Sequence, residues 1–223
     1  MIENTFKKRK HVLHYDTKDI PTQEQITDIL SKGMPLATSK QKAFAFKAFV
    51  LGPDLIRSNK LLYLCEGENI EMNRKIGGRN LPSNPNPNPG LFHLATAPYT
   101  LIWTPRLVNP NTHYKKKFMK TKGAWEMNNS SSLLNCETQI SIEIGMMSKM
   151  VMGVALDSGL DSSFCLCYSR KLSDWKPFIP QIEFSPTLIQ TIGKANSYYW
   201  EILEPEESID NTNPKVEDLF EII

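Results

Sequence analysis

The segment from residue 136 to residue 159 restricts the fold of this chain more than any other feature, because it is long and apolar on nearly every side. Its apolar residues recur at helical spacing and cover most of the circumference: Ile140, Ile142, Ile144, Met146, Met147, Met150, Val151, Val154 and Ala155. Such a helix is buried on most sides, either at the centre of a domain or in an oligomer interface. Gly145, Ser148 and Gly153 would let another backbone come close, and Ser158-Gly159 is expected to end the helix.

Short apolar runs bounded by turn residues predict the rest of the core. They favour buried strands at 45–52, 60–65, 99–104, 162–168 and 187–193. The residues from 61 to 65 could instead end a helix. A capping box formed by Thr22 and Gln25 predicts a short amphipathic helix over residues 22–32, which Gly33 closes. The order is helix, strand, insertion, strand, long helix, strand and strand, without an internal repeat, and it predicts an α+β fold.

We expect a single domain over residues 1–223, because a chain of 223 residues with 40% hydrophobic content buries one sizeable core or two small ones. Residues 76–93 contain the stretch "NLPSNPNPNPG", in which alternating prolines deny helices and sheets their donors. This region is therefore expected to be an exposed insertion. Residues 196–223 are expected to form an extended C-terminal arm with a short acidic end.

The charge balance limits the class of partner. A formal charge of +2, from 26 Lys and Arg against 24 Asp and Glu, is too even for a dedicated nucleic-acid surface, so we expect no nucleic-acid partner. Four irregularly spaced cysteines predict neither a disulfide framework nor a zinc site, and a reducing cytoplasm is the simplest compartment. No apolar run is long enough to cross a bilayer, so no membrane partner is expected.

The residues alone give little support to hydrolytic or metal chemistry, because none of the four histidines lies in a recognisable motif. What remains are cationic and hydroxyl groups in two N-terminal clusters, "KKRKHVLHYD" at 7–16 and "TSKQK" at 38–42. Arginine forks, lysine charges and hydroxyl donors are the groups that a phosphate needs. From spacing alone, both clusters could equally be ordinary basic surface.

Several stretches, taken in order, resemble the nitroreductase family of flavin-dependent oxidoreductases. The opening "RKHVLHYD" and the following "DIPTQEQITDILSKG" are similar to the family's basic start and first helix. "TSKQKAFAFKAFVLGPD" is similar to its Ser-x-x-Asn-x-x-Pro-aromatic element and first core strand. "APYTLIWTPR", "ALDSGLDSSFCLCY" and "IQTIGKA" resemble the strand after the active-site insertion, the exit of the dimer-core helix and the last core strand. The likeness covers roughly residues 9–195.

This resemblance implies a central mixed or antiparallel sheet flanked by helices, with the long helix buried at the interface of a homodimer. It also implies that FMN binds between the subunits, that NADH or NADPH reduces it, and that a nitro compound, quinone or similar small molecule reoxidises it. The cofactor would supply the chemistry and the protein would supply position and electrostatics, so no side chain is expected to be catalytic.

The resemblance also assigns cofactor-binding residues at the N-terminus. Arg9 matches the family's first phosphate-binding arginine, and His11 occupies a small hydroxyl position whose replacement ring could still donate to the phosphate. Leu13 stands where the family has a second cation, and Lys10 is the nearest substitute. Each charge-assisted phosphate contact is worth about 1.5–3 kcal/mol, so such losses matter for affinity.

Further cofactor contacts are assigned to two other segments. Ser39 matches the serine that the partner subunit offers to the flavin, and Lys42 replaces the family's asparagine. Lys40 or Lys42 could stabilise the negative charge of the reduced ring near N1. Leu166 and Cys167 fall where the family presents backbone N–H groups to the flavin ring.

Some positions depart from the family pattern. Gly90 and His93 align roughly with its asparagine and lysine near the active-site insertion, and "DNTNPKVED" lacks the cations common before the C-terminal proline turn. A flavin-free or weakly flavin-binding member of the same fold, acting as a binding or assembly protein, is therefore the alternative. A basic nucleic-acid-binding module is a third interpretation that the charge balance disfavours.

Overall fold

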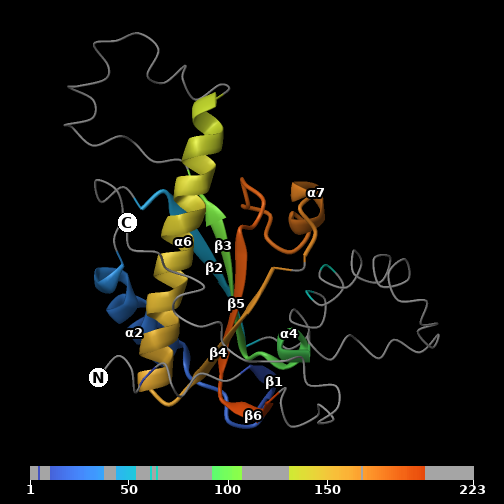
Figure 1. Cartoon of the computed structure of the whole chain (residues 1–223). Helices are drawn as coiled ribbons and strands as arrows, with labels where there is room; N and C mark the ends of the chain where they lie inside the picture. Colours follow the sequence, from blue (N-terminus) through green and yellow to red (C-terminus); the bar gives the residue numbers. More distant parts are fainter. Residues whose placement is uncertain are drawn as a thin grey trace, which may run out of the picture.

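The computed structural model describes residues 5, 11–37, 44–53, 61, 64, 92–106, 131–166 and 168–198. At their centre lies a four-stranded antiparallel sheet with the order β2-β3-β5-β4 (Figure 1). The strands are β2 (Phe46–Leu51), β3 (Tyr99–Pro105), β5 (Leu188–Gly193) and β4 (Asp161–Cys165). All four strands were predicted from their apolar runs, and the antiparallel pairing confirms an α+β fold.

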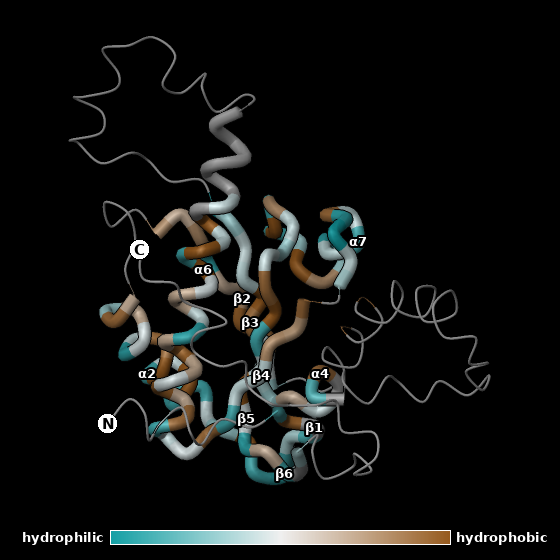
Figure 2. Tube along the Cα trace, viewed as in Figure 1, coloured by the Kyte–Doolittle hydropathy of each residue, from teal (hydrophilic) through white to brown (hydrophobic). Residues whose placement is uncertain are grey.

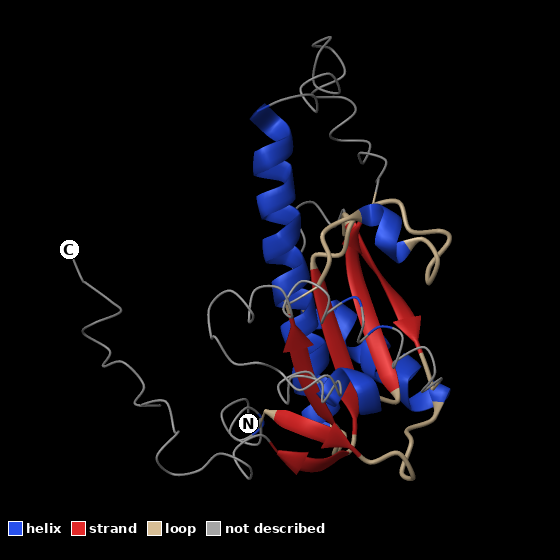
Figure 3. Cartoon of the chain, turned by 90° about the vertical axis from the view of Figure 1, so that its right-hand side faces the viewer, coloured by secondary structure: helices blue, strands red, loops and turns tan. Residues whose placement is uncertain are grey.

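Helices and smaller elements cover both faces of the sheet. On one face lie α2 (Gln23–Gly33) and α6 (Ser131–Asp157), and on the other lie the short helices α4 (Phe92–Thr96) and α7 (Leu172–Trp175) (Figures 1 and 3). Successive residues of a strand point to opposite faces, and β3 follows this rule. Leu101 and Trp103 pack in the cluster with α2 and α6, whereas Ile102 packs in the second cluster with Trp175. Figure 2 shows hydrophobic residues along these central strands.

Helix α6 is longer than predicted and less enclosed within one chain. It ends as expected at Ser158-Gly159, where Gly159 has φ +78° and the Leu160 N–H donates to the Ala155 carbonyl. One side packs on the sheet and α2, but Ile142 is 58% exposed and Met146 is 36% exposed. Burial of this helix at the centre of the domain is therefore not observed, because its apolar circumference exceeds what one sheet and one helix can cover. Its burial in an oligomer interface stays a prediction.

Helix α2 has the predicted capping box, in which Thr22 and Gln25 bond each other's backbone N–H groups. The α-helix ends at Gly33 as predicted, but Gly33 keeps a helical φ of −70° and the chain continues into the 3₁₀ turn η1 (Met34–Leu36), so the end is not a left-handed glycine cap. A Cβ at Gly33 would lie 3.0 Å from Val151 Cγ2 on α6. Glycine is needed here for the close approach of two helices rather than for a left-handed turn.

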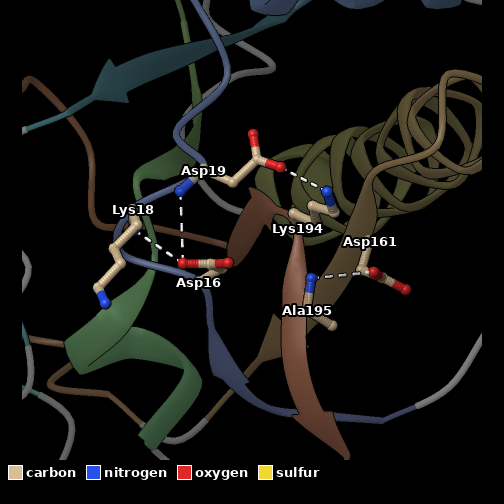
Figure 4. Close-up of polar contacts among 6 residues, drawn as sticks. All are labelled: Asp16, Lys18, Asp19, Asp161, Lys194 and Ala195. Atoms are coloured by element: carbon tan, nitrogen blue, oxygen red, sulfur yellow. Dashed lines mark hydrogen bonds and ion pairs between the residues drawn. The ribbon is translucent and has the colours of Figure 1, made fainter.

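A second, two-stranded sheet pairs β1 (Val12–Tyr15) with β6 (Ala195–Tyr198), and neither strand was predicted. The first residues of the expected C-terminal arm, 196–198, therefore belong to a strand. The turn after β1 is closed by Asp16, whose carboxylate accepts the N–H groups of Lys18 (2.8 Å) and Asp19 (3.3 Å) (Figure 4). Asp19 in turn pairs with Lys194.

The strand expected at 60–65 is not observed. Of these residues the structure describes Leu61 and Leu64, and both are helical, in agreement with the alternative. Leu61 is fully buried and Leu64 packs against the same cluster, because a spacing of three places both on one side of a helical turn. In the insertion expected at 76–93, residues 92 and 93 belong to α4, and the others lie outside the described residues.

In the described part of the chain, no helix combines the length and the apolarity that a bilayer crossing requires.

Candidate functional site

The exposed end of β4 is the first part of the candidate site. Cys165, the last residue of the strand, is 5% exposed and packs in the core, but Leu166 directly after it is 60% exposed. A single exposed leucine is ordinary on a protein surface, so Leu166 by itself marks only the point where the chain leaves the core. The resemblance placed a flavin-contacting backbone at this position.

Strand β1 lies against β4 and runs in the opposite direction. The Val12 N–H donates to Ser163 Oγ (3.3 Å) on β4, whereas the Asp16 N–H donates to the Lys194 carbonyl at the far end of the sheet (2.7 Å). His11 precedes Val12, so it is displaced toward the exposed end of β4. Two segments that the sequence analysis assigned to one cofactor, about 150 residues apart in the chain, therefore flank two strands that lie against each other.

His93 joins His11 in the same corner. The two imidazole rings meet edge to face, with centroids 6.1 Å apart and an interplanar angle of 88°. His93 lies on α4 and is only 2% exposed, and α4 is held against β1 by a hydrogen bond from the Tyr15 N–H to Thr96 Oγ1 (2.9 Å). We call the place where β1 and α4 meet, with His11 and His93, the histidine corner.

Buried hydrogen bonds hold β1 against strands β5 and β4 of the central sheet. The Tyr15 hydroxyl lies 2.9 Å from Thr191 Oγ1, and Thr191 Oγ1 donates to the Ser163 carbonyl (3.3 Å). Complete burial raises the pKa of Tyr15 far above its ordinary value, so the phenol stays neutral and can donate to Thr191. This chain of bonds ties β1, β5 and β4 together.

The second part of the candidate site lies at the start of β2. The strand register pairs Phe46 with Pro105 and Trp103 with Leu188, so the start of β2 and the end of β4 share one end of the sheet. They occupy its two opposite edges, three strand spacings apart, which is about 14 Å. Arg106, one residue past β3, bonds the backbone that leads into β2.

The structure places two of the eight predicted cofactor-binding residues, His11 and Leu166, and brings them to neighbouring elements. The other six lie outside the described residues: Arg9, Lys10, Ser39, Lys40, Lys42 and Cys167. Sequence reasoning treated His93 only as the loss of a family contact and did not consider Arg106. No local signal in the sequence connects either residue to the site, because their partners lie about 60 to 80 positions away along the chain. Among the described residues, no group of three or more metal-ligating side chains is close enough to hold an ion.

Comparison with known proteins identifies the architecture. No family sequence model matches this chain, and no curated protein sequence is significantly similar to it. The structure, however, is similar to a nitroreductase family protein from Streptococcus pneumoniae, with a TM-score of 0.66 and 14% identity over 100% of both chains. It is also similar to a predicted nitroreductase from Exiguobacterium sibiricum in complex with FMN, with a TM-score of 0.64 and 14% identity over 100% of this chain and 97% of that one.

A third similar structure is the NADPH:FMN oxidoreductase from Vibrio harveyi in complex with NAD⁺, with a TM-score of 0.58 and 11% identity. It is matched over 88% of this chain and 70% of the other. At these identities the likeness concerns the fold, and it extends over the whole chain in the first two comparisons. The resemblance inferred from ordered motifs is thereby confirmed as a shared architecture.

Proposed function

From the premise that this chain has the nitroreductase fold, we propose that it is an FMN-dependent oxidoreductase. It would take hydride from NADH or NADPH and pass it to a nitro compound, a quinone or a similar small-molecule acceptor. The observation that carries this proposal is the contact between β1 and β4, which brings His11, directly before β1, and Leu166, directly after β4, to adjacent elements, as a cofactor spanning both would require.

The groups at the histidine corner suit FMN. An imidazole N–H can donate to a phosphate, and Arg9 and Lys10 directly precede His11 in the sequence. Leu166 and Cys167 would present backbone N–H groups to the ring, and such contacts survive changes of side chain. Bound flavin would supply the redox chemistry, while the chain binds it, orients it and limits access of water.

We further propose that the chain works as a homodimer. The exposed large apolar side chains of the described residues include Ile142 and Met146 on α6, and Met34 (53%) and Leu36 (58%) on η1, which contacts α6. Gly145 lies between the first two, and a Cβ there would meet nothing within 4 Å. A two-fold interface uses the same patch on both subunits, and this apolar, sterically open face of α6 suits that role.

The positions of the two sheet edges support a site shared between subunits. Within one chain the start of β2 and the end of β4 lie on opposite edges of the sheet. A flavin at the β4 edge would therefore have the start of β2 of its own chain on the far side, and Ser39, Lys40 and Lys42 precede β2 in the sequence. A two-fold operator offers a direct way to bring the equivalent segment of the second chain to that flavin.

The test is to purify the protein, titrate it with FMN and determine its mass in solution. We expect visible flavin absorption in near-equimolar amount, bleached by NADH or NADPH under anaerobic conditions, and a sedimentation mass near twice the 25.4 kDa of the chain. A colourless protein that takes up no added FMN would reject the enzymatic proposal.

That result would favour the second candidate, a flavin-free or weakly flavin-binding member of the fold that serves as a binding or assembly protein. The observation in its favour is His93, which lies buried at 2% exposure roughly where the resemblance expects a lysine toward the flavin ring. A dimer without flavin would support this alternative.

A further inference from the structure

The segment between β4 and β5 carries an arginine that is exposed and yet held in place. Arg170 lies on the surface, but its guanidinium stacks over the ring of Tyr168, with Cζ 4.4 Å from the ring centroid. Its Nη1 also donates to the Tyr168 hydroxyl (2.9 Å). The backbone of Arg170 is fixed as well, because its carbonyl accepts the Ser185 hydroxyl (2.9 Å). The guanidinium therefore keeps a defined orientation at the surface.

The support beneath Arg170 is part of the core. Tyr168 is 2% exposed, and its hydroxyl donates to the Pro186 carbonyl (3.0 Å). Its ring meets that of Trp175 on α7 edge to face, with centroids 5.9 Å apart. Trp175 is fully buried and donates through Nε1 to the Ser169 carbonyl (2.8 Å). Arg170 is thus presented by a well-packed part of the chain.

The charge of Arg170 is not balanced within the described part of the chain, where no carboxylate forms an ion pair with it. The nearest carboxylate in the sequence, Asp174, is engaged elsewhere, because it accepts the hydroxyls of Ser169 (2.6 Å) and Ser173 (3.2 Å). Only one N–H of the guanidinium is used, for Tyr168. The remaining donors form a planar fork of the kind that matches phosphate oxygens, so they suit an anion that comes from outside the chain.

Arg170 lies at the end of the sheet where we place the flavin site. It follows Leu166 by four residues, so the two Cα atoms are at most about 14 Å apart. Tyr168 bonds the chain just before β5, and β5 begins beside the end of β4, where Ile189 pairs with Cys165. Figure 1 shows α7 beside this end of the sheet. A ligand that extends outward from the end of β4 therefore comes within reach of Arg170.

We propose that Arg170 is a specificity-determining residue that binds the 2′-phosphate of NADPH and so gives this chain a preference for NADPH over NADH. The inference rests on the proposed function, because it concerns the dinucleotide that reduces the flavin. NADPH differs from NADH only in this terminal phosphate, which lies on the adenosine half, away from the nicotinamide that must reach the flavin ring. A cation beyond the ring contact suits that half, and its exposure suits a co-substrate that binds and dissociates.

The test compares NADPH with NADH in the wild type and in R170Q, R170K and K176Q. Each dinucleotide is mixed with the FMN-loaded protein without oxygen, and an apparent Kd is obtained from the concentration dependence of flavin bleaching. In addition, 2′,5′-ADP and 5′-AMP are titrated into the same proteins by calorimetry, because they differ only in the 2′-phosphate and need no redox step. Lys176 is the matched control, since it is an exposed cation of the same segment, directly after α7.

We expect R170Q to weaken NADPH and 2′,5′-ADP about tenfold, as the loss of one charge-assisted hydrogen bond predicts, and to leave NADH and 5′-AMP within about twofold of wild type. R170K keeps the charge without the planar fork and should lie between the two, whereas K176Q should bind all four ligands as the wild type does. Circular dichroism before titration establishes that each variant is folded. If R170Q does not fold, R170K carries the comparison, with a smaller loss again confined to NADPH and 2′,5′-ADP.

Two results would overturn the role of Arg170 alone. One is a folded R170Q that binds NADPH and 2′,5′-ADP as tightly as the wild type does. The other is an equal loss for NADPH and NADH, which would mean a contact with a part that both dinucleotides share. A wild-type protein that takes up no flavin would instead reject the proposed function, and with it the role of Arg170.

Discussion

Gln190 on β5 is the residue whose replacement tests the described core most directly. Its side chain is fully buried and makes three hydrogen bonds to three different elements. Oε1 accepts from Trp103 Nε1 on β3 (3.0 Å), and Nε2 donates to the Ser148 carbonyl on α6 (3.1 Å) and to Ser162 Oγ on β4 (2.9 Å). One amide therefore joins two neighbouring strands to the helix that covers them.

We expect Gln190→Leu to lower the free energy of unfolding by about 2 kcal/mol. The substitution leaves the Trp103 N–H and the Ser162 hydroxyl without this partner in a buried place, at about 1–3 kcal/mol each. The Ser148 carbonyl keeps its helical bond, so it adds little. Burial of the leucine side chain in place of an amide returns about 1–2 kcal/mol.

The assay is equilibrium unfolding in urea, combined in a double-mutant cycle with Trp103→Phe. Phenylalanine removes the indole N–H, so the loss caused by Trp103→Phe should be about 1 kcal/mol smaller in the Gln190→Leu background than in the wild type. Free energies that add to within about 0.3 kcal/mol would show that the two side chains do not interact. A Gln190→Leu variant as stable as the wild type would refute the argument as a whole.

Two further predictions concern buried hydroxyls and a turn. Thr104 Oγ1 is buried without a hydrogen-bond partner, so Thr104→Val should raise the free energy of unfolding by up to about 1 kcal/mol. Thr191→Val is the contrasting substitution, because it removes a hydroxyl that is hydrogen-bonded. It should lower the free energy of unfolding by about 1–2 kcal/mol in the same urea assay. Hydrogen bonding by the Lys18 N–H holds the pKa of Asp16 below its ordinary 3.8, so the charge of Asp16 stabilises the fold above that pH and the benefit is lost as the pH falls through the lower folded pKa. The wild type should therefore exceed Asp16→Asn in urea midpoint at pH 7. The difference should shrink as the pH falls below 3.8 and disappear below the lowered folded pKa, and a difference unchanged at low pH would contradict this cause.

The predictable part of the fold is the part encoded by local apolar patterns. Strands β3 and β5 are buried on both faces, so their sequences are rich in apolar residues that only the core can accommodate, with a few buried polar residues such as Gln190 among them. The capping box of α2 and the glycine after α6 are equally local signals, and both lie where they were predicted.

The elements that were missed depend on contacts between distant residues. The β1–β6 sheet pairs Val12 with Tyr198, and each strand is only four residues long in a polar context, so neither carries a periodic signal of its own. At Leu61 and Leu64 an apolar run of about five residues suits a strand or a helical turn equally well, and tertiary packing decides between them. His93 became part of the candidate site in the same way, through the docking of α4 on β1.

The site residues diverge more than the architecture, and the physical demands on each explain why. A core position needs only an apolar side chain of suitable volume, so the nitroreductase fold persists at 14% identity. A phosphate contact needs a particular donor at a particular place, and here His11 and Leu13 replace the donors that the resemblance leads one to expect. Backbone groups at the end of β4 tolerate any side chain, so under the proposed function ring contacts would be the part of flavin binding best able to survive this divergence. Riboflavin should therefore bind with an affinity closer to that of FMN than in a relative with a complete phosphate site, and a preference for FMN of several decades would show that Arg9 and Lys10 have restored it.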